Sequence, residues 1–175
     1  IEEALRENPR RDHRHRIEHC EVLTPNQIER IRELNLIASM QPNFVGNWSG
    51  PGGMYEARLG PERLRRNNPY RVLLDEGVHV AFGSDSMPFH PLYGIWSAVN
   101  HPIKESRISV VEAVRCYTWE SAYSSFEEHL KGSLEPGKLA DITIVDGDMI
   151  AEPDRIKDME VYMTIVGGKI LYRRG

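Results

Sequence analysis

Residues 78–85 read VHVAFGSD, and this stretch decides how the rest of the chain is interpreted. Its first five residues are mostly apolar and do not alternate with polar ones, which is typical of a strand covered on both faces of a parallel sheet. Gly83 predicts a tight turn at the end of the strand, so Asp85 would be presented at the carboxyl edge of the sheet. That edge carries the functional side chains of α/β proteins. Asp85 is therefore a candidate metal ligand or general base, and the alternative is that it only caps the following turn.

Composition describes an ordinary globular chain. Its 175 residues are 40% hydrophobic, carry a formal net charge of −4 and include two cysteines. This charge gives no argument for nucleic acid or an anionic membrane as a partner, and no apolar run approaches the roughly 20 residues of a membrane helix. Two cysteines cannot make a disulfide framework, so a cytoplasmic location is expected. The chain begins with Ile1 and not with Met, which predicts that a preceding segment is missing.

Strands and helices alternate through the first two-thirds of the chain. Apolar patterning predicts strands at residues 14–20, 36–42 and 78–85, and helices at 24–34, 62–76 (broken near Pro69) and 109–124. Thr24 with Gln27, and Ser109 with Glu112, form capping boxes at two of the helix starts. A long irregular segment is expected at 43–61, and a loop at 86–107 with a short helix near 93–99. Such alternation predicts parallel strands joined by right-handed crossovers.

A different pattern follows in the last third of the chain. Residues 139–146 and 161–166 read as strands, and Gly167-Gly168 is a two-residue hairpin signal before a returning strand at 169–172. The sequence therefore predicts two domains, residues 1–125 with the parallel sheet and residues 126–175 with an antiparallel one.

Four motifs in order carry a family resemblance: RIEH at 16–19, SMQP at 39–42, GSD at 83–85 and GSLEPGKLAD at 132–141. Together they resemble the carboxyl-terminal part of a metal-dependent amidohydrolase, in particular of amidohydrolase family 3, which includes N-substituted formamide deformylases. The resemblance implies an α/β fold, a distorted (β/α)₈ barrel followed by a small composite β-sandwich. Residues 14–20, 37–41 and 80–85 would then be barrel strands six, seven and eight.

The resemblance also implies a mechanism. His19 and Asp85 would be ligands of a divalent metal, most often zinc, present as one or two ions in the parent enzyme. Asp85 would in addition accept a proton from the attacking water. The substrate would be a small molecule with an amide, formamide or cyclic amide C–N bond. The alternative for His19 is a core histidine that hydrogen-bonds to the backbone.

Two further residues are candidates for contact with substrate. Trp48 and His90 lie in segments that follow the second and third parallel strands, on the face expected to be active. The alternatives are that Trp48 only fixes its own segment and that His90 is a solvated loop residue.

The remaining histidines are expected to be outside the site. His13 and His15 have the His-x-His spacing of metal ligands, but His15 lies roughly 13 Å back along its strand from His19 and is interpreted as a surface residue. His79 starts its strand and is set aside for the same reason. His101 follows the third parallel strand on the face expected to be active; it is interpreted as a solvated loop histidine, and the alternative is contact with substrate.

Much of the family pattern does not occur in this sequence. Two protein ligands are too few for a catalytic zinc ion, and three β/α units cannot close a barrel of about 250 residues. A fragment is therefore expected, inactive and metal-free by itself, to be completed by an amino-terminal half or by other copies in a homo-oligomer. The alternative function is an inactive module that self-assembles through open edges at the strands 14–20 and 80–85.

Overall fold

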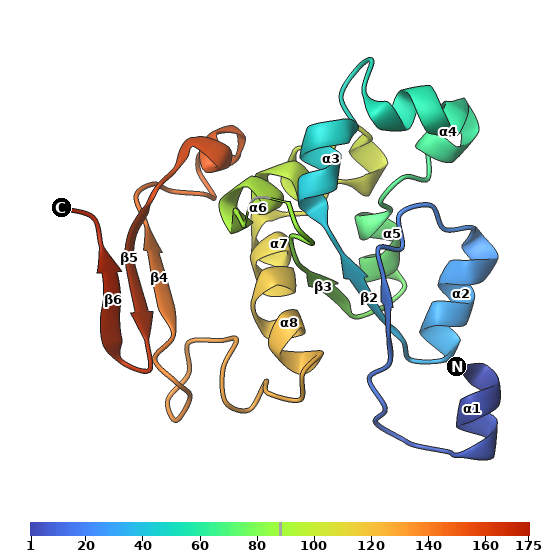
Figure 1. Ribbon diagram of the computed structural model, residues 1–175, viewed down its shortest axis with the longest axis horizontal. Helices are drawn as coiled ribbons and strands as arrows, with labels where there is room; N and C mark the ends of the chain where they lie inside the picture. The colour runs from blue at the N-terminus through green and yellow to red at the C-terminus, as the bar shows by residue number, and fades with distance from the viewer. Residues whose placement is uncertain (88) are drawn as a thin grey trace.

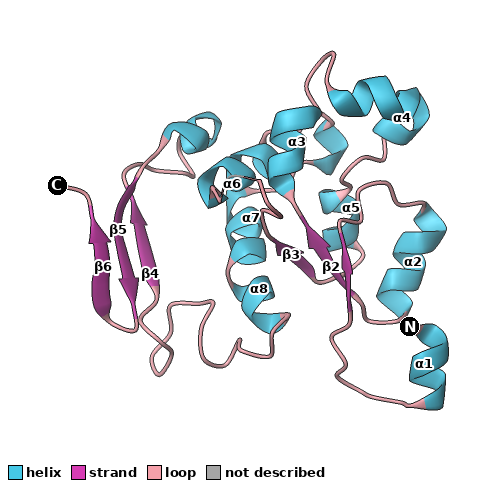
Figure 2. Cartoon of the chain, viewed as in Figure 1, coloured by secondary structure: helices cyan, strands magenta, loops and turns pink. Residues whose placement is uncertain are grey.

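Two small sheets with helices between them make up the fold (Figures 1 and 2). The computed structural model describes residues 1–87 and 89–175. A parallel sheet has the order β1 (Arg16–Glu18), β2 (Ile37–Met40), β3 (Val80–Phe82). An antiparallel sheet has the order β4 (Ile142–Val145), β5 (Val161–Val166), β6 (Lys169–Arg173). The predicted change from parallel to antiparallel pairing is confirmed, and the turn between β5 and β6 falls at Gly167-Gly168 as expected.

The register of the parallel sheet aligns the carboxyl ends of its strands. Glu18 pairs with Ser39 on β2, and Ser39 pairs with Ala81 on β3. The residues that follow each strand therefore emerge at one edge of the sheet. Apolar side chains of β2 and β3 are buried in the main core, as continuous apolar runs predict for covered strands.

Helix α2 (Pro25–Glu33) crosses from β1 to β2 and begins as the sequence predicts. The Gln27 amide donates to Thr24 Oγ1 at 3.3 Å, and the Thr24 amide donates to Gln27 Oε1 at 2.8 Å. This capping box satisfies two backbone donors that the first helical turn leaves free. Ile28 and Ile31 on the inner face of the helix are buried.

The prediction of a long irregular segment at 43–61 is wrong, because two helices occupy most of these residues. They are α3 (Pro42–Trp48) and α4 (Met54–Leu64), and α5 (Tyr70–Asp75) follows. Pro42 ends β2 and also begins α3. Proline suits the first turn of a helix, because the N–H group that it lacks would have no helical partner there. Glycines separate the helices at 50–53, and Gly60, with a φ of 72°, kinks α4 before Pro61. The helix expected over 62–76 is broken near Pro69, as predicted: its first part belongs to α4, and α5 begins directly after Pro69.

After β3 the chain forms α6 (Pro91–Val99), which confirms the expected short helix, and then η1 (Lys104–Ser106). Residue 88, within the loop expected there, lies outside the described residues. The capping box of Ser109 and Glu112 starts α7 (Val110–Tyr117) as predicted. The helix expected to continue to 124 breaks at Thr118, whose backbone (φ −115°, ψ −83°) is not helical, and α8 (Trp119–Tyr123) follows.

Short elements complete the chain. Helix α1 (Glu2–Glu7) precedes β1 and ends before Pro9, since proline cannot continue a helix. A 3₁₀ helix, η2 (Pro153–Asp158), links β4 to β5 and packs against α6. In Figure 1 the helices α6, α7 and α8 lie between the two sheets. No helix in the described part of the chain has the length and apolar character needed to cross a membrane.

The two outer strands of the parallel sheet differ in exposure. All three residues of β1 are exposed, as expected for an open edge. Every residue of β3 is buried, although β3 pairs with β2 alone and is an outer strand of the sheet. Helices α5, α7 and α8 contact β3 and cover it.

Candidate functional site

Three polar side chains meet where the parallel strands end. His19 follows β1 directly after Glu18, Gln41 follows β2, and Asp85 follows β3 after two intervening residues. His19 Nδ1 lies 3.9 Å from Asp85 Oδ2, and each of these side chains is half exposed. The structure thus brings together the two residues singled out as metal ligands, at the edge where the sheet presents its side chains to solvent.

The backbone is unusual at both positions. His19 and Cys20 have φ values of 70° and 52°, and Asp85 and Ser86 have 41° and 59°. Residues other than glycine rarely adopt this left-handed conformation, and such strain is concentrated at functional sites. Gly83 has no positive φ, so the turn expected there is made instead by Asp85 and Ser86. The two strand ends are therefore bent sharply at the candidate ligands themselves.

Gln41 is a site residue that the sequence reasoning did not select. Its side chain is buried between the two strand ends, and its Oε1 lies 2.9 Å from His19 Nδ1. Its Nε2 donates to the Ser39 carbonyl at 3.4 Å. The signal that could have found it is its position: Gln41 is the first polar side chain after the central strand, so it must lie between the residues that end the outer strands.

An aromatic row extends from His19 across α3 and α4. The ring of Phe44 lies 6.2 Å from that of His19, Trp48 follows at 4.7 Å from Phe44, and Tyr55 at 6.0 Å from Trp48. Tyr55 Oη donates to Glu21 Oε2 at 2.7 Å, and burial with this hydrogen bond raises the Tyr55 pKa above its usual value. Trp48 therefore packs within a row that begins at the site, and its contact with substrate stays a prediction.

His90 caps α6, since its Nδ1 accepts a hydrogen bond from the Tyr93 amide at 3.1 Å. Within residues 1–87 and 89–175, neither Trp48 nor His90 hydrogen-bonds to His19 or Asp85. The structure therefore does not join Trp48 or His90 to the pair of His19 and Asp85. Contact of His90 with substrate stays a prediction.

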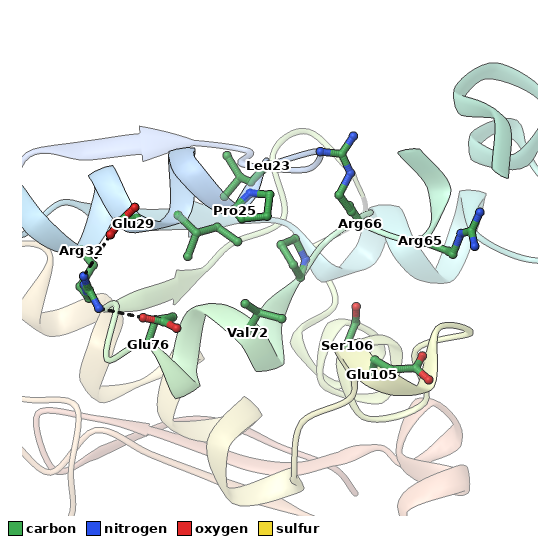
Figure 3. A pocket seen from close by; sticks show the side chains of 12 residues that line it. Leu23, Pro25, Glu29, Arg32, Arg65, Arg66, Val72, Glu76, Glu105 and Ser106 are labelled. Atoms are coloured by element: carbon green, nitrogen blue, oxygen red, sulfur yellow. Dashed lines mark hydrogen bonds and ion pairs between the residues drawn. The ribbon is translucent and has the colours of Figure 1, made fainter. Parts of the chain in front are cut away.

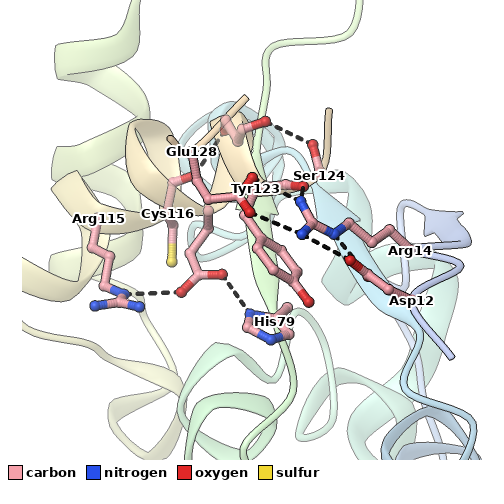
Figure 4. A network of polar contacts seen from close by, with 10 residues as sticks. Asp12, Arg14, His79, Arg115, Cys116, Tyr123, Ser124 and Glu128 are labelled. Atoms are coloured by element: carbon pink, nitrogen blue, oxygen red, sulfur yellow. Dashed lines mark hydrogen bonds and ion pairs between the residues drawn. The ribbon is translucent and has the colours of Figure 1, made fainter. Parts of the chain in front are cut away.

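Histidines at the opposite end of the sheet have structural partners. His79, just before β3, lies 2.8 Å from Glu120 Oε2 and stacks on Tyr123 with the ring centres 4.2 Å apart (Figure 4). His13 and His15 stack on each other at 4.8 Å. None of them is near the carboxyl end of the sheet, because each precedes its strand.

His101 corrects the expectation of a solvated loop histidine. It is fully buried, and its Nδ1 accepts a hydrogen bond from the Ile103 amide at 3.0 Å. Burial, with the nearby charge of Arg107, lowers the His101 pKa to about 4. The ring is therefore neutral at pH 7 and acts as a polar support of the loop between α6 and η1.

A groove of about 400 Å³ lies elsewhere, between α2, α5 and η1 (Figure 3). Leu23, Ile28 and Val72 give it an apolar lining, and Arg32 at its rim is paired with Glu76 at 3.1 Å. It includes none of the residues at the strand ends. This groove is therefore separate from the candidate site.

The donor set at the strand ends fits part of a metal centre. His19 offers a ring nitrogen and Asp85 a carboxylate oxygen, both of which are donors that zinc binds, and the two side chains approach each other to 3.9 Å. Within the described ranges, no group of three or more His, Cys, Asp or Glu residues is placed to hold an ion. The pair can therefore supply two ligands, and a complete catalytic site requires at least one more.

Comparison with known families identifies the family of this chain. The model of a family described as "Amidohydrolase family" matches residues 1–172. The chain belongs to the amidohydrolase family. This amidohydrolase chain is 32% identical to the putative amidohydrolase YtcJ of Bacillus subtilis over 98% of its own length and 34% of that relative. It is 28% identical to the N-substituted formamide deformylase of Arthrobacter pascens, over 98% of the chain and 33% of the deformylase.

The chain also resembles part of a solved structure. The chain superposes with a TM-score of 0.65 and 31% identity on an uncharacterized metal-dependent hydrolase from Pyrococcus furiosus, covering 78% of this amidohydrolase chain and 28% of that one. The chain thus spans about a third of the length of the curated relatives it matches. The match therefore establishes the family of this chain, and it covers only part of each relative.

Proposed function

We propose that this chain supplies the carboxyl-terminal part of the catalytic site of a metal-dependent hydrolase that cleaves a C–N bond in an amide, formamide or cyclic amide. The observation that carries the proposal is the meeting of His19 and Asp85, 3.9 Å apart, at the carboxyl end of a parallel sheet in a member of the amidohydrolase family. Strands β1, β2 and β3 would be strands six, seven and eight of a (β/α)₈ barrel, and residues 126–175 would belong to a β-sandwich.

His19 and Asp85 would hold a divalent metal, which we propose to be zinc. When bound, such an ion acidifies water and polarises a carbonyl group. Asp85 has one oxygen facing His19, and half of its side chain is exposed, so it can also meet a water molecule. Its carboxylate would accept a proton from the attacking water and return it to the leaving nitrogen, which is the work of a general base and then of a general acid.

A chimaera tests this assignment. Residues 1–175 are joined to the preceding part of a full-length relative, and hydrolysis of a panel of N-substituted formamides, amides and cyclic amides is measured together with zinc content. We expect zinc-dependent hydrolysis, and a fall of at least about 100-fold in kcat for Asp85→Asn because the proton acceptor is lost. Asp154→Asn, at an exposed aspartate on η2, is the matched control and should leave kcat unchanged. Equal activity of the Asp85→Asn and unaltered enzymes would refute the role of Asp85.

The alternative is an inactive module that assembles through its exposed strands, and one observation favours it. All residues of β1 and of β6 are exposed, so both present edges that another chain could pair with. Sedimentation of the 175-residue chain, with zinc measured per chain, separates the two functions. A discrete oligomer that contains no zinc, together with an inactive chimaera, would favour the module, whereas a monomer would exclude it.

A further inference from the structure

The central strand ends in a buried amide that contacts one of the proposed ligands. Gln41 is 5% exposed, and its Oε1 lies 2.9 Å from His19 Nδ1. A buried polar side chain needs a hydrogen-bond partner, so this contact fixes both groups. From it we infer that Gln41 is a positioning residue that keeps the His19 ring proton on Nδ1 and leaves Nε2 free to bind the metal. The inference rests on the proposed function for the metal and on the hydrogen-bond geometry for the proton.

The orientation of the Gln41 amide follows from its second contact. Gln41 Nε2 is 3.4 Å from the Ser39 carbonyl oxygen, which can only accept hydrogen bonds. The same carbonyl accepts from the His19 amide at 2.7 Å, which ties the end of β1 to β2. The amide nitrogen of Gln41 must therefore face Ser39, and its oxygen must face His19.

This orientation determines the tautomer of His19. The amide oxygen of Gln41 is an acceptor, so His19 Nδ1 must carry the hydrogen that it donates. A neutral imidazole has a single ring N–H, and Nε2 is then left with a free lone pair. Histidines that bind metals commonly donate their other ring N–H to a carboxylate or carbonyl oxygen, and the amide oxygen of Gln41 takes that part here.

Asp85 does not compete for the same proton. Its Oδ2 is 3.9 Å from His19 Nδ1, beyond the range of a hydrogen bond, whereas Gln41 Oε1 is 2.9 Å away. The Asp85 carboxylate is therefore not hydrogen-bonded to the His19 ring, and half of its side chain is exposed to solvent. The ring of Phe44, almost parallel to that of His19 at 17° and 6.2 Å, lies beside the histidine and adds to the fixing of its plane.

The first test reads the tautomer directly in the metal-free 175-residue chain. The ¹⁵N shifts of the His19 ring are measured at increasing pH until they no longer change, so that the tautomers of the neutral ring are compared. We expect the Nδ1–H form in the unaltered chain and a shift of the main population to Nε2–H in Gln41→Leu. Gln41→Glu keeps an acceptor oxygen and should retain Nδ1–H. An unchanged tautomer in Gln41→Leu would overturn the inference.

A matched control separates positioning from general damage to the fold. Gln27→Leu removes the other glutamine, whose Oε1 caps α2 at 2.8 Å, and should leave the His19 tautomer unchanged while lowering stability. If Gln41→Leu does not fold, Gln41→Glu carries the test alone: a change of its His19 tautomer to Nε2–H would contradict the role of the acceptor oxygen.

The second test is zinc affinity in the chimaera described above. Loss of the partner of a ligating histidine commonly costs 10–100-fold in metal affinity, so Gln41→Leu should raise the zinc Kd by about that factor and Gln41→Glu should restore it. A tautomer change without any change in zinc affinity would refute the metal role of His19 and leave the positioning by Gln41 standing. An unchanged tautomer would refute the positioning whatever the zinc affinity, so the two failures are distinguishable.

Discussion

Arg14 shows how much a single residue can hold together in this chain. Its guanidinium donates to both oxygens of Glu128, at 2.7 and 2.8 Å, and to the Tyr123 carbonyl at 2.6 Å (Figure 4). It also lies 3.8 Å above the ring of Tyr123, and the Arg14 side chain is only 9% exposed. These contacts attach the segment before β1 to the end of α8 and to the segment that follows it, more than 100 residues away in the sequence.

The Arg14–Glu128 pair predicts a pH dependence of stability. The hydrogen bonds from Arg14 lower the Glu128 pKa from its ordinary value of 4.5 to about 2. Because the folded-state pKa is the lower one, the stabilisation is complete above pH 4.5 and is lost as the pH falls toward 2. We expect Glu128→Gln to reduce the free energy of unfolding by about 1 kcal/mol at pH 7, since the carboxylate is partly solvated. Urea denaturation as a function of pH measures the difference.

The neighbouring residue Glu127 provides the control. It pairs with Lys131 at 2.7 Å, but both side chains are about 40% exposed, so Glu127→Gln should change the free energy of unfolding by less than about 0.5 kcal/mol. A Glu128→Gln deficit that stays constant from pH 7 to pH 2 would show that the carboxylate charge is not its cause.

At the scale of residues, sequence reasoning selected the site only in part. His19 and Asp85 stand in recognisable motifs at strand ends, and the structure places them together. Gln41 was not selected, because its role depends on the register of β1 against β2, which puts the Ser39 carbonyl next to the Gln41 side chain and the His19 backbone amide. The positive φ values of His19 and Asp85 had no signal in the sequence either, since neither position is a glycine.

At the scale of elements, α3 and α6 pack closely through glycines. A Cβ on Gly46 would lie 2.3 Å from Ser97 Oγ, and one on Gly94 would lie 1.9 Å from Tyr117 Oη and 2.5 Å from Asn43 Oδ1. Tyr117 Oη donates to Asn43 Oδ1 at 3.1 Å across this contact. Helix α3 begins directly after Gln41 at the end of β2. Its packing on α6 therefore holds in place the helix that starts next to the candidate site.

The close contact predicts the effect of Gly94→Ala. Alanine favours a helix by about 1 kcal/mol over glycine, but the methyl group would displace Tyr117 and break its hydrogen bond to Asn43. We expect a net loss of about 2 kcal/mol in the free energy of unfolding. Gly50→Ala, at a glycine with empty space around its Cβ position, is the control and should be close to neutral. Equal stability of Gly94→Ala and the unaltered chain would mean that α3 and α6 can move apart at no cost.

Element boundaries were predicted well where a local signal sets them and poorly where it does not. Both capping boxes begin helices at the expected residue, because the cap is a contact within one helical turn. The segment 43–61 was interpreted as irregular since it is rich in Gly, Asn and Pro, yet burial of Phe44, Val45 and Tyr55 stabilises helices there. Tertiary packing overrides weak local propensity in such a segment.

At the scale of the whole molecule, one apolar core connects the two sheets. It contains residues of β2 and β3 together with Ile156 and Met159, which belong to or follow η2. The sequence predicted two separate units, because the strand pattern changes from parallel to antiparallel. It gave no indication that η2 packs on α6, since Ile156 is the one buried residue among the six of η2.

A shared core predicts that the two sheets unfold together. Ile156 is fully buried, so Ile156→Ala should cost about 3 kcal/mol through the lost apolar contact and the cavity it leaves. Hydrogen exchange then distinguishes the possibilities, because protection of β2 and β5 amides should fall by the same free energy if unfolding is a single transition. Ile170→Ala on β6, where the side chain is exposed, is the control and should change protection in neither sheet. Loss of protection confined to β4–β6 would mean that the antiparallel sheet is an independent unit, docked on the helices without sharing in their stability.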